Sequence, residues 1–255
     1  MGDLAAIHGW PALVAAFALM GLAGFVKGAV GFALPMIAVS AIGSILPAPL
    51  AVAAVILPSL ASNLWQALRQ GLGEAWGSLR RFLWLNAVLV ATIWASAQLV
   101  AVLSDRALFL ILGVGVTGFS ALQLSGWRPP DPGPDRRVEA ATGVVAGFFG
   151  GLSGVWGPPI VLYLLARQVP KVEMVRVQGI SYLAGSVTLT AAHGGTGLLG
   201  GAAAWLSAAM VVPALAGMWV GLRLQDRMPQ ARFRRVTMVV LVLAGLNLLR
   251  RGLAG

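Results

Sequence analysis

The sequence predicts an all-α polytopic membrane protein with two inverted-topology repeats, and three observations lead to this prediction. The chain has 255 residues, of which 58% are hydrophobic and only 10% are charged, against about 25% charged residues in average soluble domains. Several apolar runs reach the roughly 20 residues that a helix needs to cross a bilayer. Two stretches rich in Gly and Pro, 24–37 and 147–160, match each other at an offset of 123 residues.

The first repeat is expected at residues 1–124 and opens with a broken apolar segment at 11–45. Gly24, Gly28, Gly31 and Pro35 interrupt this segment, and Gly and Pro both disturb regular helix. In lipid, a broken backbone survives only where protein covers it or where it lines a wet cavity. We therefore expect a re-entrant helical hairpin at 11–45. Three transmembrane helices follow it, at 47–69, 82–103 and 107–124.

The second repeat is expected at residues 139–255, after a linker at 125–138 that is rich in Pro and Gly and divides the halves. It repeats the same plan, with a broken hairpin at 140–168 and helices at 174–193, 200–222 and 234–251. The offset pairs Gly24 with Gly147, Gly28 with Gly151, Gly31 with Gly154 and Pro35 with Pro158. The alternative to two hairpins is two long, kinked and tilted helices.

The distribution of Lys and Arg favours the hairpins. If both broken segments crossed the membrane fully, the basic residues of the loops, including the loop expected at 70–81, would divide 8 to 9 and would set no orientation. If both are re-entrant, 14 basic residues share one side and only Arg106, Arg250 and Arg251 oppose them. The positive-inside rule then makes the larger group and the linker cytoplasmic, and places both termini in the periplasm. Each half has an odd number of crossings, so the halves are inverted and their hairpin tips meet near the midplane.

Lys27 is the only basic residue deep within an apolar segment. A charge at that depth is costly and marks a functional site by default. The neighbouring Gly28 and Gly31 let backbone N–H groups approach a ligand closely, and a helix that starts after the hairpin tip presents a positive dipole end. Together these groups predict an anion site. The alternatives are a lysine that snorkels to the surface or one that only raises the anion concentration at a mouth.

Two polar stripes lie beside the hairpins. Ser59, Ser62, Asn63 and Gln66 share one face of the segment after the first hairpin, because they are spaced by three or four residues. Gln178, Ser181 and Tyr182 form a second stripe, beside Gly151, Ser153 and Gly154 of the second hairpin. Neutral donors of this kind suit a small oxyanion, so we favour a transport pathway. The alternative for each residue is an interhelical hydrogen bond.

The acidic residues disfavour a cation carrier, because none lies in the middle of an apolar segment. Glu139 and Glu173 flank the second hairpin and could carry protons, although solvated loop charges are the simpler interpretation. No cofactor and no metal site are expected, and the chain has no cysteine. The formal net charge of +10 is explained by basic cytoplasmic loops, so no nucleic-acid partner is expected. Outward movement of an anion needs no coupling ion, because the inside-negative potential drives it.

An alternative of another class is an intramembrane serine protease. Gly151, Leu152, Ser153 and Gly154 match the G-x-S-G motif of rhomboid proteases, and His193 could act as the base. The repeat already explains the glycines, and the predicted topology places His193 at the opposite membrane face. A structural or assembly protein of the membrane is the remaining alternative.

Both broken segments resemble the two halves of the sulfite exporter TauE/SafE family, also called the toluene sulfonate uptake permease family. The resemblance rests on Gly24, Gly28, Gly31 and Pro35 in one half and on Gly147–Pro159 in the other, with Ser62, Asn63 and Arg69 in the second segment. It implies a carrier of sulfite, sulfonates or sulfoacetate-like anions in the bacterial inner membrane. The membrane potential favours the outward direction, and the repeats place the expected site at the midplane between the two broken hairpins. Proton-coupled uptake of the same anions is the nearest alternative. The expected partners are a small anion and the lipid bilayer, and a homodimer is left open.

Overall fold

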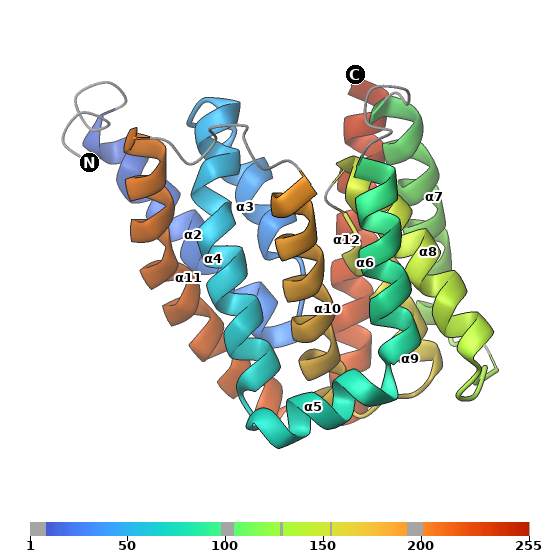
Figure 1. The fold of residues 1–255 in the computed structure, drawn as a ribbon. Coiled ribbons are helices and arrows are strands. Elements are labelled where there is room, and N and C mark those ends of the chain that lie inside the picture. The colour runs from blue at the N-terminus through green and yellow to red at the C-terminus, as the bar shows by residue number, and fades with distance from the viewer. Residues whose placement is uncertain (1–8, 98–104, 128–129, 154, 193–200, 255) are drawn as a thin grey trace. The chain divides into compact units, whose positions relative to one another are not determined.

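All eleven helices of the described residues are α-helices, and these residues contain no strand, in the computed structural model of the chain (Figure 1). The structure describes residues 9–97, 105–127, 130–153, 155–192 and 201–254. This confirms the all-α prediction. The helices are α2 (Trp10–Val30), α3 (Leu34–Ile42), α4 (Ala48–Leu68), α5 (Leu72–Arg81), α6 (Leu83–Ala97), α7 (Asp105–Leu124), α8 (Arg136–Ser153), α9 (Gly157–Ala166), α10 (Lys171–Ala192), α11 (Gly201–Arg227) and α12 (Gln230–Ala254).

Four of these helices contain segments that are long and apolar enough to cross a membrane: Trp10–Val30, Leu50–Leu68, Ala203–Arg227 and Gln230–Leu253. Shorter apolar helices accompany them at Leu83–Ala97, Gly113–Leu124 and Gly157–Ala166. A helix rises about 1.5 Å per residue, so the 21 residues of α2 span about 32 Å, close to the ~30 Å hydrocarbon core. The helices are those of a multi-pass membrane protein.

Helix bounds in the second half follow those in the first at the offset of 123. Shifting α3 by 123 gives 157–165, against Gly157–Ala166 for α9, and shifting α4 gives 171–191, against Lys171–Ala192 for α10. By the same shift α2 corresponds to α8, α6 lies within α11, and α7 overlaps α12. The segment that corresponds to α5 by this shift is 195–204, and residues 195–200 of it lie outside the described residues. The inversion of one repeat relative to the other stays a prediction.

The chain forms two compact units that cut across this repeat pattern. Unit 1 consists of residues 1–65 and 195–228, and unit 2 consists of residues 66–194 and 229–255. Unit 1 therefore holds α2, α3, most of α4 and α11. Unit 2 holds the end of α4, α5 to α10 and α12.

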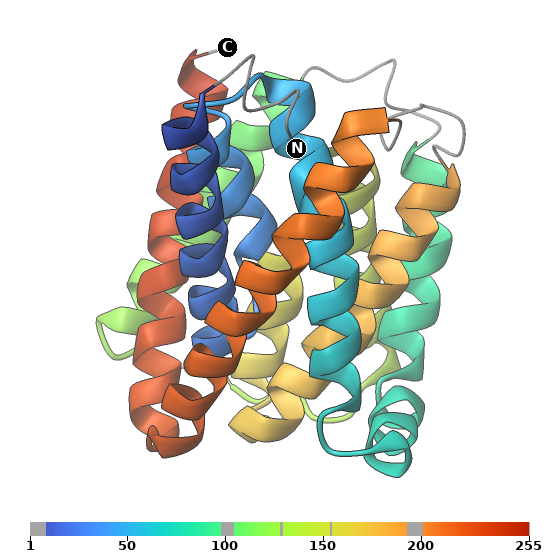
Figure 2. The same ribbon diagram turned by 90° about the vertical axis from the view of Figure 1, so that its left-hand side faces the viewer.

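In unit 1, α2 packs directly on α11 through glycines (Figure 2). A Cβ at Gly24 would overlap the carbonyl oxygen of Ala214, and one at Gly28 would overlap that of Met218. Gly217 and Gly221 of α11 meet the backbone of α2 in the same way. Small residues at such contacts let two membrane helices approach closely. Gly24 and Gly28, which we expected to interrupt the helix, are helical, because their missing side chains serve this contact.

In unit 2, α8 packs on α6 through the glycines that correspond to Gly24 and Gly28 at the offset of 123. A Cβ at Gly147 would crowd Thr92, and a Cβ at Gly151 would overlap the hydroxyl of Ser96. The Ser96 hydroxyl donates a 3.0 Å hydrogen bond to the carbonyl of Gly147. The first helix of each repeat is thus packed against a helix of the other repeat.

The second arm of each hairpin returns beside the first. In unit 1, Leu13 near the start of α2 shares a core cluster with Ile42 and Leu46 at the end of α3. In unit 2, Val138 at the start of α8 and Tyr163 near the end of α9 line one pocket. The two arms of each hairpin are therefore antiparallel within their own unit.

Candidate functional site

The break between α2 and α3 is sharp and involves one strained residue. Gly31 has a φ of 90° and donates a 2.6 Å hydrogen bond from its N–H to the carbonyl of Lys27. Ala33 has a φ of 77°, in the left-handed region that is unfavourable for a residue with a side chain. Helix α3 begins one residue later, with Pro35 in its first turn. The break therefore lies at residues 31–33, next to Lys27.

Lys27 lies at the end of α2 with only 2% of its surface exposed. Its ammonium group donates a hydrogen bond to Oδ1 of Asn63 on α4. Asn63 is 3% exposed, so the structure brings together two residues that the sequence assigned to separate elements. Burying an ammonium group without compensation is very costly. The amide oxygen of Asn63 holds the ammonium group in place.

The α4 residues before Asn63 extend this polar region within unit 1. Ser62 is fully buried and its hydroxyl donates to the carbonyl of Ser59 at 3.1 Å. The hydroxyl of Ser59 is buried too and has no hydrogen-bond partner among the described residues. Pro58 lies inside α4 and has no N–H to donate, so the helix hydrogen bonding is interrupted beside these residues. Unit 1 thus groups Lys27, Ser59, Ser62 and Asn63.

In unit 2, Gln178 on α10 is the predicted residue whose polar side chain is buried with no hydrogen-bond partner among the described residues. Its side chain is fully buried, and neither its amide nitrogen nor its amide oxygen has a hydrogen-bond partner among the described residues. A buried amide left unpaired costs about 1–3 kcal/mol. Such a group in a native structure needs an explanation, and a polar ligand is one of the accepted explanations.

Ser181 and Tyr182 follow Gln178 on α10, and the hydroxyl groups of both form hydrogen bonds. The hydroxyl of Ser181 donates to Oδ1 of Asn86 on α6 at 2.7 Å. The amide of Asn86 in turn donates to the carbonyl of Phe82 at 2.8 Å. The hydroxyl of Tyr182 donates to the carbonyl of Gly157, the first residue of α9, at 3.4 Å. These bonds tie α10 to α6 and to the second hairpin.

Gln66 and Gly151 serve helix packing, as Gly28 does in unit 1. The side-chain nitrogen of Gln66 donates to the carbonyl of Val175 at 2.7 Å, at a point where Gly179 lets α10 approach the end of α4. Gly151 is the close-contact glycine between α8 and α6. Gly154 and His193 lie outside the described residues, as does the side chain of Ser153. The structure therefore says nothing about a Ser153–His193 pair.

The two acidic candidates lie in different environments of unit 2. Glu139, at the start of α8 and ahead of its apolar run, is 5% exposed. Burial raises its pKa above the ordinary range, against the opposing effects of Arg167, the Leu85 backbone, Tyr163 and Arg136. Glu173 instead forms an ion pair with Arg81, with an N–O distance of 2.9 Å. Of the two, Glu139 is the better candidate for a proton carrier.

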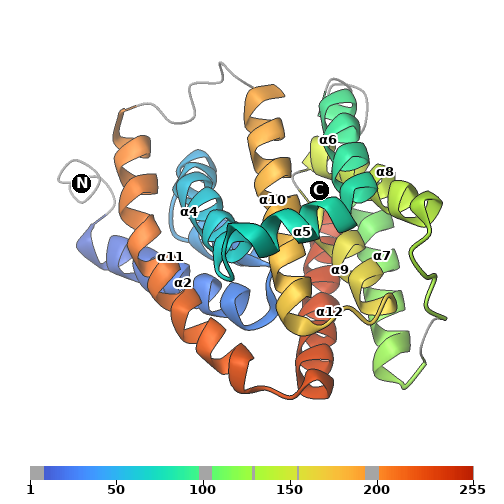
Figure 3. The ribbon, with the colours of Figure 1, turned by 60° about the horizontal axis from the view of Figure 1, so that its bottom comes forward.

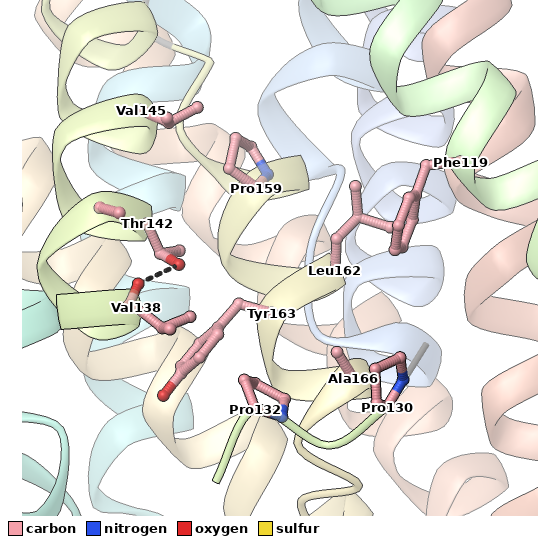
Figure 4. A pocket seen from close by; sticks show the side chains of 11 residues that line it. Phe119, Pro130, Pro132, Val138, Thr142, Val145, Pro159, Leu162, Tyr163 and Ala166 are labelled. Atoms are coloured by element: carbon pink, nitrogen blue, oxygen red, sulfur yellow. Dashed lines mark hydrogen bonds between the residues drawn. The ribbon is translucent and has the colours of Figure 1, made fainter. Parts of the chain in front are cut away.

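A pocket of about 480 Å³ opens beside the second hairpin (Figure 4). Figure 4 shows that its lining comes from Phe119 of α7, the linker prolines, α8 and α9. Its polar groups are few: the Thr142 hydroxyl already donates to the carbonyl of Val138 at 2.8 Å, and Tyr163 turns its ring toward the cavity. An apolar lining of this kind does not suit an oxyanion, so we do not place the anion there.

Three buried polar residues of interest escaped the sequence analysis. Asn86, Ser96 and Ser207 each lie within an apolar segment and hydrogen-bond across helices, Ser207 by accepting the N–H of Leu57 at 3.1 Å. Their signal in the sequence was a single polar residue in an apolar run. No group of three or more His, Cys, Asp or Glu side chains in the described part of the chain could hold a metal ion.

A comparison with protein families gives one match that covers nearly the whole chain. The family described as Sulfite exporter TauE/SafE matches residues 16–248. This range includes both breaks, Lys27, Asn63, Gln178 and Glu139. No curated protein matches the chain. No solved structure matches it either.

Proposed function

Because the chain belongs to the sulfite exporter TauE/SafE family, we propose that it exports small sulfur-containing oxyanions such as sulfite, sulfonates or sulfoacetate-like anions from the bacterial cytoplasm. The family consists of membrane transporters and not of enzymes, so the protease alternative is discarded. The family indicates a small anion as the substrate class. The particular anion, the outward direction and the inner-membrane location are proposed.

The observation that carries the proposal is the buried ammonium group of Lys27, held on Asn63 beside the break at residues 31–33. A buried ammonium group is stabilised when an anion binds next to it. The cost of burying Lys27 is thus recovered when the substrate is present, which is a physical reason for selectivity toward anions.

The two breaks differ in what they offer an anion. After the first break, α3 has a single proline in its first turn, so several N–H groups at its start remain as donors. After the second break, α9 begins Gly157-Pro158-Pro159, and two of its first three residues have no N–H. We propose that the first hairpin binds the negative charge. In unit 2, Gln178 supplies a neutral amide that an oxyanion can satisfy during passage.

The membrane potential supports outward movement. With the inside negative, a monoanion that leaves the cell gains about 2.3 kcal/mol per 100 mV and a dianion gains twice that. Export therefore proceeds without a coupling ion. Uptake of the same anion would work against this potential and would need one.

Proton-coupled uptake is the second candidate, and the burial of Glu139 is the observation that favours it. A carboxyl whose pKa is raised by burial takes up a proton at a higher pH than an ordinary glutamate. It could therefore bind and release a proton during each transport cycle. Glu173 is a poor alternative for this role, because its carboxylate is already engaged in the ion pair with Arg81.

Flux of sulfite and of a sulfonate in proteoliposomes tests both candidates, first under an imposed voltage and then under an imposed pH gradient. We expect voltage alone to drive flux, and Glu139→Gln to leave it unchanged. Flux that requires the pH gradient and is lost in Glu139→Gln, but kept in the control Glu173→Gln, would replace export by proton-coupled uptake. Absence of flux for both anions in folded protein would overturn the proposed substrate class.

A further inference from the structure

Helix α5 (Leu72–Arg81) occupies a segment that we expected to be a loop, and it has two opposite faces. Leu72, Trp76 and Leu79 are spaced by four and three residues, so they form one stripe along the helix. Glu74, Ser78 and Arg81 follow the same spacing on the other side. Such a helix is amphipathic, with a polar stripe opposite an apolar one.

The polar stripe is fixed to the start of α10, within unit 2. Arg176 of α10 donates from Nε to the hydroxyl of Ser78 at 2.8 Å and forms an ion pair with Glu74 at 3.1 Å. Arg81 at the end of α5 pairs with Glu173 of α10 at 2.9 Å. Figures 1 and 3 show that α5 runs across the ends of α6 and α10 and not alongside them.

Two of the three residues of the apolar stripe are exposed, and Leu79 is partly buried. Leu72 is 75% exposed and Trp76 is 54% exposed. Arg80 lies over the ring of Trp76, at 4.8 Å from its centroid. Leu83 and Trp84 at the start of α6 are also exposed, and Arg136 at the start of α8 lies 5.9 Å from the ring of Trp84. Unit 2 thus presents two exposed Trp residues, each with an Arg over its ring.

We propose that α5 lies in the membrane interface and binds anionic phospholipid there, with Leu72 and Trp76 among the upper acyl carbons and Arg80 at the phosphate groups. Trp is enriched at the boundary between hydrocarbon and water, where one part of its ring is apolar and the other is wet. A horizontal amphipathic helix with a basic flank is the usual form of an interfacial helix. The charge of Arg80 selects anionic lipid over zwitterionic lipid.

The position of α5 gives this lipid contact a mechanical consequence. Its polar stripe holds the first turns of α10, and α10 carries Gln178 and Tyr182 further along. A lipid-bound α5 therefore anchors the helix that carries the proposed amide ligand. The proposal does not depend on which anion the chain carries.

The absence of cysteine allows a direct test with single labels on the full chain. Leu72→Cys carries a fluorophore on the apolar stripe and keeps Trp76 and Arg80. Gly77→Cys is the matched control, because Gly77 lies on another face of α5 and its Cβ would point into open space. Quenching is measured in phosphatidylcholine vesicles that contain either spin-labelled phosphatidylcholine or spin-labelled phosphatidylglycerol.

We expect the label at position 72 to be quenched strongly and phosphatidylglycerol to be preferred about fivefold, the ratio that corresponds to one basic residue at the surface. Arg80→Gln should bring this preference close to unity. The label at position 77 should show weak quenching and no preference.

Equal quenching of position 72 by both lipids would overturn the proposal. So would weak quenching that grows when the protein is diluted in the vesicles, which would show that a second copy covers the stripe. Anion flux in the same vesicles separates a failure here from a failure of the transport proposal.

Discussion

At the scale of single residues, the pair of Lys27 and Asn63 is the most informative feature. A lysine with only 2% of its surface exposed, at the end of a long apolar helix, is unfavourable for stability and marks a functional site by default. The amide of Asn63 orients the ammonium group but carries no charge. The pair is thus suited to hold a transient anion, whereas a permanent Lys–Glu pair would compete with it.

The variant Lys27→Met keeps the apolar stem and removes the charge, and we expect anion flux to fall by about ten- to a hundredfold. This range corresponds to the loss of one charged hydrogen bond, about 1.5–3 kcal/mol. Flux in proteoliposomes is the measurement, and Lys171→Met at the start of α10 is the control for loss of a basic residue.

A second variant separates transport from folding. Lys27→Met leaves Asn63 without this donor, whereas the double variant Lys27→Met/Asn63→Leu replaces both partners by apolar groups and should regain thermal stability in detergent. We expect the double variant to stay inactive. If flux returned together with stability, Lys27 would have a structural role and the anion site would have to lie elsewhere.

At the scale of helices, the sequence predicted apolar segments well and the position of the break poorly. Long apolar runs predict helices because a lipid environment requires internally satisfied backbone groups. Glycine, in contrast, signals both a break and a close helix contact, and only the partner helix decides between them. Gly24 and Gly28 belong to the contact with α11, while Gly31 and Ala33 form the break.

For the candidate site, too, the sequence identified single residues but not their contacts with other helices. Lys27 and Gln178 could be selected from the sequence because each polar group lies in an apolar run. That Asn63 holds Lys27, and that Asn86 holds Ser181, depends on how helices pack side by side, which spacing along one helix does not reveal. Helix α5 was missed because its ten residues are too few and too polar for a spanning segment.

The glycine contacts give a prediction at this scale. Gly28→Ala should destabilise the protein by about 1–3 kcal/mol, because the added methyl group overlaps the Met218 carbonyl and forces α2 and α11 apart. Gly115→Ala on α7 is the matched control. Nothing lies within 4 Å of its Cβ, so it should be neutral or stabilising by up to about 1 kcal/mol.

Reversible unfolding in mixed micelles measures both variants, and Gly151→Ala in the α8–α6 contact should behave like Gly28→Ala. Equal stability of the Gly28 and Gly115 variants would show that the α2–α11 contact is looser than its geometry indicates.

At the scale of the whole molecule, the distribution of Lys and Arg predicts how the protein is oriented in the membrane. With both termini in the periplasm, the turn after α3 faces outward and the linker after α7 faces the cytoplasm. Ser44 and Ser125 are exposed residues in these two places. Because the chain has no cysteine, one introduced thiol reports one position.

We expect Ser44→Cys to react with a membrane-impermeant maleimide in intact cells, and Ser125→Cys to react only after the membrane is permeabilised. The extent of labelling on a gel is the measurement. The reverse pattern would invert the orientation, and labelling of both in intact cells would contradict the prediction that the membrane lies between the two sites.

The packing of α2 against α11 has a consequence for how the protein is made. In the chain, 171 positions separate the end of α2 at Val30 from the start of α11 at Gly201. At about 5–20 residues per second, a ribosome needs roughly 10–30 s to add that length. Throughout this interval α2 lacks the helix that later covers its glycines. The contact between α2 and α11 can therefore form only after most of the chain has been translated.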